Sequence, residues 1–208
     1  RSSAAEIDAR VAGLTVPKQF VQLAARHPDS VLLRALDGDG NWTEYTIADV
    51  RQLAGEVAAG LLANDVDPGD RVLLMMRNIP AFHWLDLAAQ MVRATPVSIY
   101  NSSSPEEIQY LAEHAEAEVA IVEDDGFLQR ILKVRAEQPS LQKIFVLNPP
   151  AGDLPDGVFP ATELSGCGLR LDMSDTLAVA ISQSGTSTDT NRTVDLLTSR
   201  GAAVLAIV

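Results

Sequence analysis

A run of hydroxyl-bearing residues lies at positions 182–188, where the sequence reads SQSGTST. The run begins at the end of an apolar segment, LAVAIS (177–182), and precedes a segment with helical spacing, 189–199. A turn before a helix offers free backbone N–H groups and the positive end of the helix dipole, and hydroxyl groups add further donors. Gly185 lets an oxygen atom approach the backbone closely. We therefore predict a phosphate-binding turn, although the same serines and threonines would also serve as an ordinary helix N-cap.

No other group of residues predicts catalysis or metal binding. The three histidines, His27, His83 and His114, do not have the spacing of zinc ligands. Cys167 is the single cysteine and is interpreted as a loop residue, which excludes a disulfide within the chain and favours a cytosolic setting. The acidic run 123–125 is interpreted as the start of a solvated helix. We therefore assign no catalytic residue and no metal ligand.

Composition and charge restrict the class of protein. The chain has 208 residues, of which 47% are hydrophobic and 21% charged, so it can form one large domain or two small ones. Its net charge of −12 argues against a general nucleic-acid binder, which needs clustered Lys and Arg. The sequence contains no apolar run of about 18 residues and no signal peptide, so we expect no transmembrane segment. We expect a cytoplasmic location, with peripheral membrane association as an alternative, and leave the oligomeric state open.

Strands and helices are expected to alternate along the chain. We predict strands at 31–36, 42–47, 71–76, 95–100, 118–123, 143–147, 177–182 and 202–208, helices at 47–62, 80–92, 105–114, 127–136 and 189–199, and a loop at 148–160. The first two strands form a hairpin around DGDGN. The remaining pattern predicts an α/β fold with a mainly parallel sheet and helices on both faces. Ligands of such sheets bind beyond the carboxyl ends of the strands, which is where the turn at 182–188 would lie.

Two helix starts carry strong capping signals. Thr46 is expected to cap the helix that begins at residue 47. Ser104, Pro105 and Glu107 form the pattern of a capping box with proline at the first helical position. The polar stretch 100–104 follows a strand and could therefore edge a cleft, although the helix cap accounts for it equally well.

Most of the chain resembles a known family. The segments WTEYT, LAGEVAAGLLANDVDPGDRVLLMMRN and FHWLDLAAQMVRATPVSIYNSSSPEEIQYLAEHAEAEVAIVED, with the order of their elements, resemble the N-terminal part of AMP-forming acyl-CoA synthetases. The similarity covers residues 17 to about 170 and is greatest to long-chain fatty-acid–CoA ligases. The resemblance implies a synthetase N-terminal (AMP-binding) region over 1–170. Because the chain begins at Arg1 and stops in the apolar segment 204–208, we expect a truncated piece of a longer protein.

The turn at 182–188 matches that family only in part. The synthetases have a loop of the form T-S-G-T-T-G-x-P-K-G that holds the β- and γ-phosphates of ATP, and Ser184, Gly185 and Thr186 fit its S-G-T core. Thr188 stands where the second glycine is expected, and no Pro-Lys-Gly follows. The resemblance implies that Ser184, Gly185, Thr186, Ser187 and Thr188 contact the ATP phosphates.

The tail of the chain also resembles a second family. The segment VAISQSGTSTDTNRTVDLLTSRGAAVLAIV is similar to the sugar isomerase (SIS) domain of glutamine–fructose-6-phosphate aminotransferases, whose motif is S-Q-S-G-x-T-x-D-T. Asp189 and Thr190 continue that match. This second resemblance implies a sugar-phosphate site formed by Ser182, Gln183, Ser184 and Ser187. A joined chain with its junction near 170–180 would explain both matches, and it would make 171–208 a separate strand–loop–helix–strand segment.

The first resemblance implies a two-step reaction. A fatty acid attacks the α-phosphate of Mg²⁺-bound ATP to give an acyl-adenylate, and the thiol of CoA then displaces AMP. The family's later motifs are absent from this chain, so we predict that it does not catalyse the reaction alone. A sugar-phosphate-binding module is the alternative, and a non-catalytic interaction fragment is a third hypothesis.

Overall fold

The computed structural model of this protein describes residues 3–36, 39–136, 140–166, 177–181 and 203–207. The chain divides into two compact units, Arg1–Ser165 and Gly166–Val208. The first unit contains a two-stranded hairpin and a five-stranded sheet, and the second contains a two-stranded sheet.

The centre of the first unit is an entirely parallel sheet. Its strand order is β4-β3-β5-β6-β7, and every neighbouring pair is parallel. The strands are β3 (Arg71–Met75), β4 (Thr95–Ser98), β5 (Val119–Asp124), β6 (Lys143–Asn148) and β7 (Val158–Pro160). This arrangement confirms the predicted fold class.

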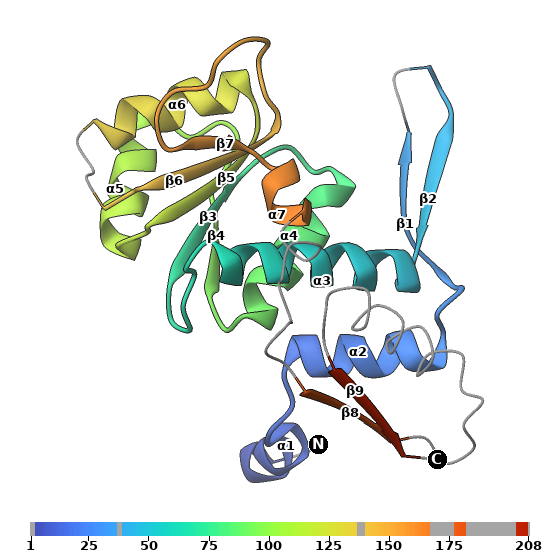
Figure 1. The fold of residues 1–208 in the computed structure, drawn as a ribbon. Coiled ribbons are helices and arrows are strands. Elements are labelled where there is room, and N and C mark those ends of the chain that lie inside the picture. Colours follow the sequence, from blue (N-terminus) through green and yellow to red (C-terminus); the bar gives the residue numbers. More distant parts are fainter. Residues whose placement is uncertain (1–2, 37–38, 137–139, 167–176, 182–202, 208) are drawn as a thin grey trace. The chain divides into compact units, whose positions relative to one another are not determined.

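Both faces of the sheet are buried, because alternate residues of each strand point to opposite sides. Val72 and Leu74 of β3 pack in one hydrophobic cluster, whereas Leu73 and Met75 pack in the other. The first cluster is completed by α3 (Ile47–Ala63) and α4 (Pro80–Met91), and the second by α5 (Pro105–Ala115) and α6 (Asp125–Arg135). Figure 1 shows these two pairs of helices on opposite sides of the strands.

The predicted helix caps are confirmed. The Thr46 hydroxyl accepts a hydrogen bond from the N–H of Asp49 (3.1 Å), and the Asp49 carboxylate accepts one from the N–H of Thr46 (2.8 Å). Ser104 and Glu107 form the same reciprocal pair at the start of α5. Since these bonds satisfy backbone N–H groups that the helix leaves free, the local sequence is sufficient to position both starts.

The rest of the first unit comprises a hairpin and three further helices. Strands β1 (Val31–Leu36) and β2 (Trp42–Thr46) pair antiparallel, as predicted. The helices are α1 (Ala4–Val11), α2 (Val16–Arg26) and α7 (Thr162–Gly166). Leu164 of α7 is completely buried in the same cluster as α3 and α4.

Three predictions differ from the structure by two residues or more. The segment 148–160 was expected to be a loop, but it ends in β7, which pairs Val158 with Ile144 of β6. The three residues of β7 are too few to show periodicity, and prolines and glycines surround them. Strand β4 ends at Ser98 rather than at residue 100, and α6 begins at Asp125 rather than 127 because Asp124 provides its N-cap.

In the second unit the structure describes two strands. Strands β8 (Leu177–Ile181) and β9 (Ala203–Ile207) pair in parallel, with Leu177 opposite Ala203. Both segments were expected to be strands. The helix predicted at 189–199 lies outside the described residues. None of the described helices is long and apolar enough to cross a membrane.

Candidate functional site

The sheet reverses its direction of growth at β3. The chain passes from β3 through α4 to β4 on one side, and then through α5 to β5 on the other side of β3. At such a reversal the segments that leave two adjacent parallel strands diverge, which opens a crevice at the carboxyl edge. The residues that follow β3 and end β5 therefore form the candidate site of this fold.

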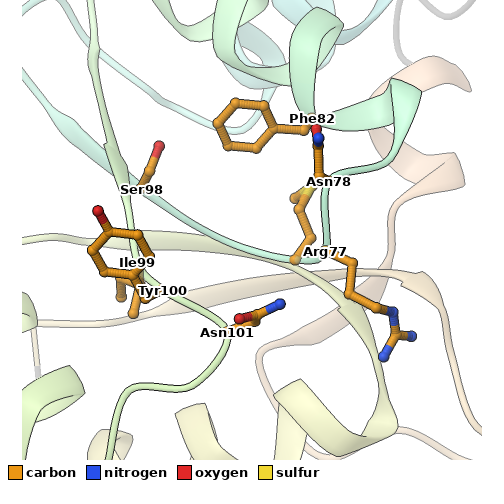
Figure 2. A pocket seen from close by; sticks show the side chains of 8 residues that line it. Arg77, Asn78, Phe82, Ser98, Ile99, Tyr100 and Asn101 are labelled. Atoms are coloured by element: carbon orange, nitrogen blue, oxygen red, sulfur yellow. The ribbon is translucent and has the colours of Figure 1, made fainter.

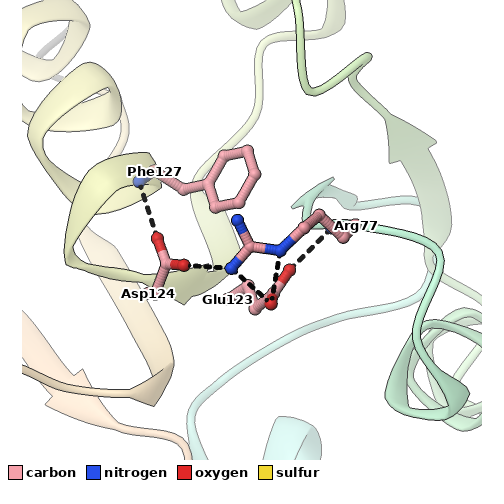
Figure 3. A network of polar contacts seen from close by, with 4 residues as sticks. All are labelled: Arg77, Glu123, Asp124 and Phe127. Carbon is pink, nitrogen blue, oxygen red and sulfur yellow. Dashed lines mark hydrogen bonds and ion pairs between the residues drawn. The ribbon is translucent and has the colours of Figure 1, made fainter. Parts of the chain in front are cut away.

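An ionic network joins the ends of these two strands (Figure 3). The Arg77 side chain donates from Nε to Oε1 of Glu123 at 2.9 Å, and its backbone N–H donates to Oε2 of the same carboxylate at 2.7 Å. The Arg77 guanidinium also donates to the carboxylate of Asp124, which accepts a further bond from the N–H of Phe127 at 3.3 Å. The network links β3, β5 and the first turn of α6 across the crevice.

Charge pairing alters the ionisation of this network. Hydrogen bonds from Arg77 to Asp124, and then to Glu123, raise the pKa of the guanidinium above its ordinary value. Partial burial opposes ionisation of Asp124, but the bonds from Arg77 and Phe127 outweigh it and lower the pKa of that carboxyl. Arg77 therefore carries a positive charge that is paired with two carboxylates.

A second arginine extends the network toward β4. The guanidinium carbons of Arg77 and Arg130 each lie 5.3 Å from the centre of the Phe127 ring, a distance typical of cation–π contacts. Arg130 also donates to the backbone oxygen of Asn101, in the segment that follows β4. The ends of β3, β4 and β5 are thus linked by side chains and not by sheet hydrogen bonds alone.

A pocket of about 420 Å³ opens between the ends of β3 and β4. Figure 2 shows Phe82, from the first turn of α4, facing it, with the residues that follow each strand around the rim. Its lining combines apolar side chains with the polar Asn78, Ser98 and Asn101, and Arg77 lies at its edge. Apolar walls with a few polar groups are typical of small-molecule sites, so the pocket can bind an apolar or aromatic part of a ligand and orient it through amide groups.

The described residues offer little for a metal ion. Among them, no group of three or more histidine, cysteine, aspartate or glutamate side chains has the arrangement of a metal site. The two carboxylates at the crevice, Glu123 and Asp124, are already engaged by Arg77. A divalent cation at this edge would have to compete with the guanidinium for them.

The structure corrects the interpretation of the acidic run 123–125. Asp124 and Asp125 do start a helix, but Glu123 is only 6% exposed and is bonded to Arg77 rather than to solvent. Arg77 and Asn78 were not identified from the sequence. Their position directly after a buried strand could have identified them, since that is where parallel sheets place ligand contacts.

The other predicted residues either line the pocket or lie outside the described part of the chain. Tyr100 and Asn101 line the pocket, so the stretch that follows β4 does edge a cleft. The turn that carries Ser182, Gln183, Ser184, Gly185, Thr186, Ser187 and Thr188 lies outside the described residues, as do Cys167, Asp189 and Thr190. The structure therefore does not test the site predicted from the sequence.

A parallel sheet with helices on both faces and a crevice at its switch point defines an open α/β domain of the ligand-binding type. The family model described as "AMP-binding enzyme" matches residues 20–186. Because the match spans most of the chain, the chain belongs to the family of AMP-binding enzymes.

Two relatives illustrate the extent of the similarity. An uncharacterized protein of Mycobacterium tuberculosis is 37% identical over 141 residues, which cover 66% of this chain and 75% of that protein. Long-chain-fatty-acid–CoA ligase FadD15 of Mycobacterium bovis is 30% identical over 136 residues, which cover 65% of this chain but 22% of the ligase. The chain thus matches about one fifth of the length of this named ligase.

Solved structures show the same fold. Coronafacic acid ligase from Pectobacterium brasiliense superposes with a TM-score of 0.67 over 93% of this chain and 46% of that one, at 14% identity. Anthranilate CoA ligase AuaEII, solved in complex with anthranoyl-AMP, gives a TM-score of 0.58 over 64% of this chain and 25% of that one, at 22% identity. The fold is therefore that of acyl-CoA and related ligases.

Proposed function

We propose that this chain is the N-terminal portion of a long-chain fatty-acid–CoA ligase. The observation that carries the proposal is the family match over residues 20–186, which includes the whole five-stranded sheet and extends into the hydroxyl-rich turn. The similarity to FadD15 supports a long-chain fatty acid as the acyl substrate. The 22% coverage of that ligase supports the interpretation as a portion of a longer enzyme.

The proposed reaction forms an acyl-adenylate from a fatty acid and ATP with Mg²⁺, and then a thioester with CoA. We assign the contacts with the ATP phosphates to Ser184, Gly185, Thr186, Ser187 and Thr188. The family match supports this assignment because it ends at Thr186 and so includes the S-G-T core. The proposed partners are these small molecules, and the proposed location is cytoplasmic, with or without peripheral membrane binding.

The pocket at the carboxyl edge is consistent with a small-molecule function. It lies beside the switch point of the sheet, and its lining combines Phe82 with the amides of Asn78 and Asn101. Such a site suits the apolar or aromatic part of a substrate. Residue-resolved chemical shift changes on addition of palmitate, ATP or CoA would show which of the three contacts it.

Catalysis by this chain alone is not expected. Purified protein should form no palmitoyl-CoA from palmitate, ATP and CoA, because four fifths of the related ligase has no counterpart in the match. Turnover at about 1 per second or faster, in the ordinary range of enzymes, would contradict this expectation. A full ligase such as FadD15 assayed in parallel provides the positive control.

A sugar-phosphate-binding module over 171–208 remains the alternative function. The specific observation in its favour is the ordered match of Ser182, Gln183, Ser184, Gly185, Asp189 and Thr190 to the sugar isomerase motif. Calorimetric titration with Mg-ATP and with fructose 6-phosphate separates the two hypotheses. A synthetase turn should prefer Mg-ATP, and a sugar isomerase turn should prefer the sugar phosphate.

Single substitutions sharpen this comparison because the two assignments share only part of the turn. Ser184→Ala should weaken whichever ligand binds, by about 0.5–1.5 kcal/mol for one neutral hydrogen bond. Thr188→Ala should weaken only ATP binding, and Gln183→Ala only sugar-phosphate binding, with Thr193→Ala as the control outside both assignments. Failure of both ligands to bind at millimolar concentration would leave the turn as a helix N-cap.

A further inference from the structure

The pocket at the carboxyl edge of the sheet has one charged side chain in its lining. That side chain is Arg77, and its guanidinium is directed away from Phe82 and Ser98 (Figure 2). The other lining residues are uncharged: Met76, Asn78, Phe82, Ser98, Ile99, Tyr100 and Asn101. The kind of ligand that this pocket accepts therefore depends on whether Arg77 offers its charge to the pocket.

Two carboxylates hold the Arg77 guanidinium at the edge of the pocket. Oε1 of Glu123 lies 2.9 Å from Nε and 2.8 Å from Nη2, and Asp124 accepts a further bond from Nη2 (Figure 3). The Glu123 side chain is only 7% exposed, so it would be left as an uncompensated buried charge if Arg77 turned away. The orientation of Arg77 is thus set by the carboxylates, and its Nε and Nη2 donors are used outside the pocket.

The charges around this edge of the pocket cancel. Arg77 contributes one positive charge and the two carboxylates two negative ones, and Arg130, which also contacts the Phe127 ring, brings the sum to zero. Arg130 is not part of the pocket lining and donates to the backbone oxygen of Asn101. An anion that entered the pocket would therefore lose its water without gaining a free cation, which is unfavourable.

We propose that Glu123 and Asp124 make this pocket selective for an uncharged group, because they hold Arg77 out of it. The ligand class is a neutral amide or similar polar group joined to an apolar or aromatic part. The amides of Asn78 and Asn101 can pair with such a group, which carboxylates and phosphates do not match without a cation. Glu123 and Asp124 act through Arg77 and are positioning residues, not ligand contacts.

The selectivity goes beyond the proposed ligase function and is tested separately from it. Within that function, it excludes the ionised carboxylate of the fatty acid and the phosphates of ATP from this pocket. An uncharged part of a substrate would occupy it. Since the test measures binding of small probes and not thioester formation, absence of ligase activity does not bear on it.

Benzamide and benzoate are suitable probes because they match in shape and differ in charge. Each is titrated into the full 208-residue chain while the side-chain amide NMR signals of Asn78 and Asn101 are followed. Asn78→Ala and Asn101→Ala assign the two signals. Benzamide should shift both signals in a saturable way, and benzoate should bind at least about tenfold more weakly, because burial of an unpaired carboxylate is costly.

Variants of the two carboxylates should reverse this preference. Glu123→Gln with Asp124→Asn releases Arg77 and should strengthen benzoate binding by about tenfold or more, the factor expected for one hydrogen bond to a charged group. Asp124→Asn alone removes only the partly exposed carboxylate and should show part of the gain. The matched control, Glu118→Gln with Asp125→Asn, makes the same change in net charge at exposed positions and should leave both affinities unchanged.

A gain of benzoate binding separates selectivity from stability, because loss of structure would weaken both probes. Adding Arg77→Gln to Asp124→Asn should cancel the gain. Four results would overturn the proposal: no benzamide shift in the unmodified chain, benzoate binding as tight as benzamide binding, no gain in Asp124→Asn, or a gain that the control shares or that survives Arg77→Gln.

Discussion

Strand β3 of the five-stranded sheet and strand β1 of the hairpin are both short and rich in apolar residues, yet they bury these residues differently. In β3 four of five residues are buried, and helices cover both of its faces. In β1 no residue is fully buried, and Leu36 is 57% exposed. An apolar strand is therefore not sufficient to form a core, because its burial depends on which elements the tertiary structure packs over it.

The hairpin is held to the rest of the first unit at its base. Tyr45 of β2 contacts Trp84 of α4 with their ring centres 5.3 Å apart, and Thr46 continues directly into the cap of α3. Trp42, at the outer end of β2, is 65% exposed. An isolated two-stranded hairpin is marginally stable in water, so we infer that its stability comes from these few contacts.

The largest difference between the two regions should appear on truncating an aromatic residue. Phe145→Ala in β6 removes a completely buried ring that packs against Phe159, and should lower the free energy of unfolding by about 3–5 kcal/mol. Trp42→Ala in the hairpin removes a ring that is 65% exposed, and should change it by less than about 0.5 kcal/mol. Urea denaturation followed by circular dichroism measures both. Similar losses of unfolding free energy in the two variants would contradict the difference in burial between the sheet and the hairpin.

Glycines in α3 provide a second comparison, between the covered and the open side of one helix. A Cβ atom at Gly60 would lie 1.9 Å from the backbone oxygen of Leu164 in α7, so Gly60→Ala should destabilise the protein by about 1–3 kcal/mol. Gly55 has open space around it, so Gly55→Ala should stabilise the same helix by up to about 1 kcal/mol. Thermal unfolding should therefore shift in opposite directions for the two variants. A shift in the same direction would mean that α7 does not pack against α3 as described.

The buried carboxylate at the crevice should be sensitive to loss of its charge. Glu123→Gln removes one acceptor for the backbone and side chain of Arg77, and should cost about 1–3 kcal/mol of unfolding free energy. Glu118→Gln, at an exposed position just before β5, is the matched control and should cost little. Denaturant unfolding of both variants measures the difference. A neutral Glu123→Gln would indicate that the network does not hold β3 and β5 together.

Acid should weaken the same network through Asp124. Its pKa is lowered below the ordinary value of 3.8, so its contribution to stability is present above that value and is lost as the pH falls through the lower, folded-state pKa. Asp124→Asn should therefore reduce stability at neutral pH and flatten the loss of stability below about pH 4. Unfolding curves measured across this range test the sign. A variant whose acid sensitivity is unchanged would exclude a role for Asp124.

The smallest expected effect lies where the hairpin meets α3. Thr46→Ala removes the N-cap hydroxyl and should cost about 1 kcal/mol. It should also move the pKa of Asp49 back toward its ordinary value, since the Thr46 hydroxyl is the main cause of its lowering. Thr43→Ala, on the exposed part of β2, should change stability by less than about 0.5 kcal/mol. Carbon-detected NMR titration of the Asp49 carboxyl would verify the second expectation.

Local patterns were enough to predict most of the elements. Residues 71–76 and 143–147 are apolar at every position after the first, which predicted strands buried on both faces, and the Ser104–Glu107 box located the start of α5. Strand β7 was not predicted, because three residues among prolines and glycines show no periodicity. It is a strand because Val158 pairs with Ile144 of β6. Helices α1 and α2 were not predicted either, although the sequence carries their caps, Ser3 and Thr15.

The sequence by itself determined most of the alternation of strands and helices, the starts of α3, α4 and α5 and the membership of an α/β class, because these follow from hydrogen bonds and periodicities within a few residues. The tertiary structure decided that β3 lies at the centre of the sheet, and therefore that Arg77 meets Glu123, 46 positions further along the chain. It also decided that the residues after β3 and β4 enclose one pocket. Strand order depends on which apolar faces cover one another, and that is a property of the packed chain rather than of any segment of it.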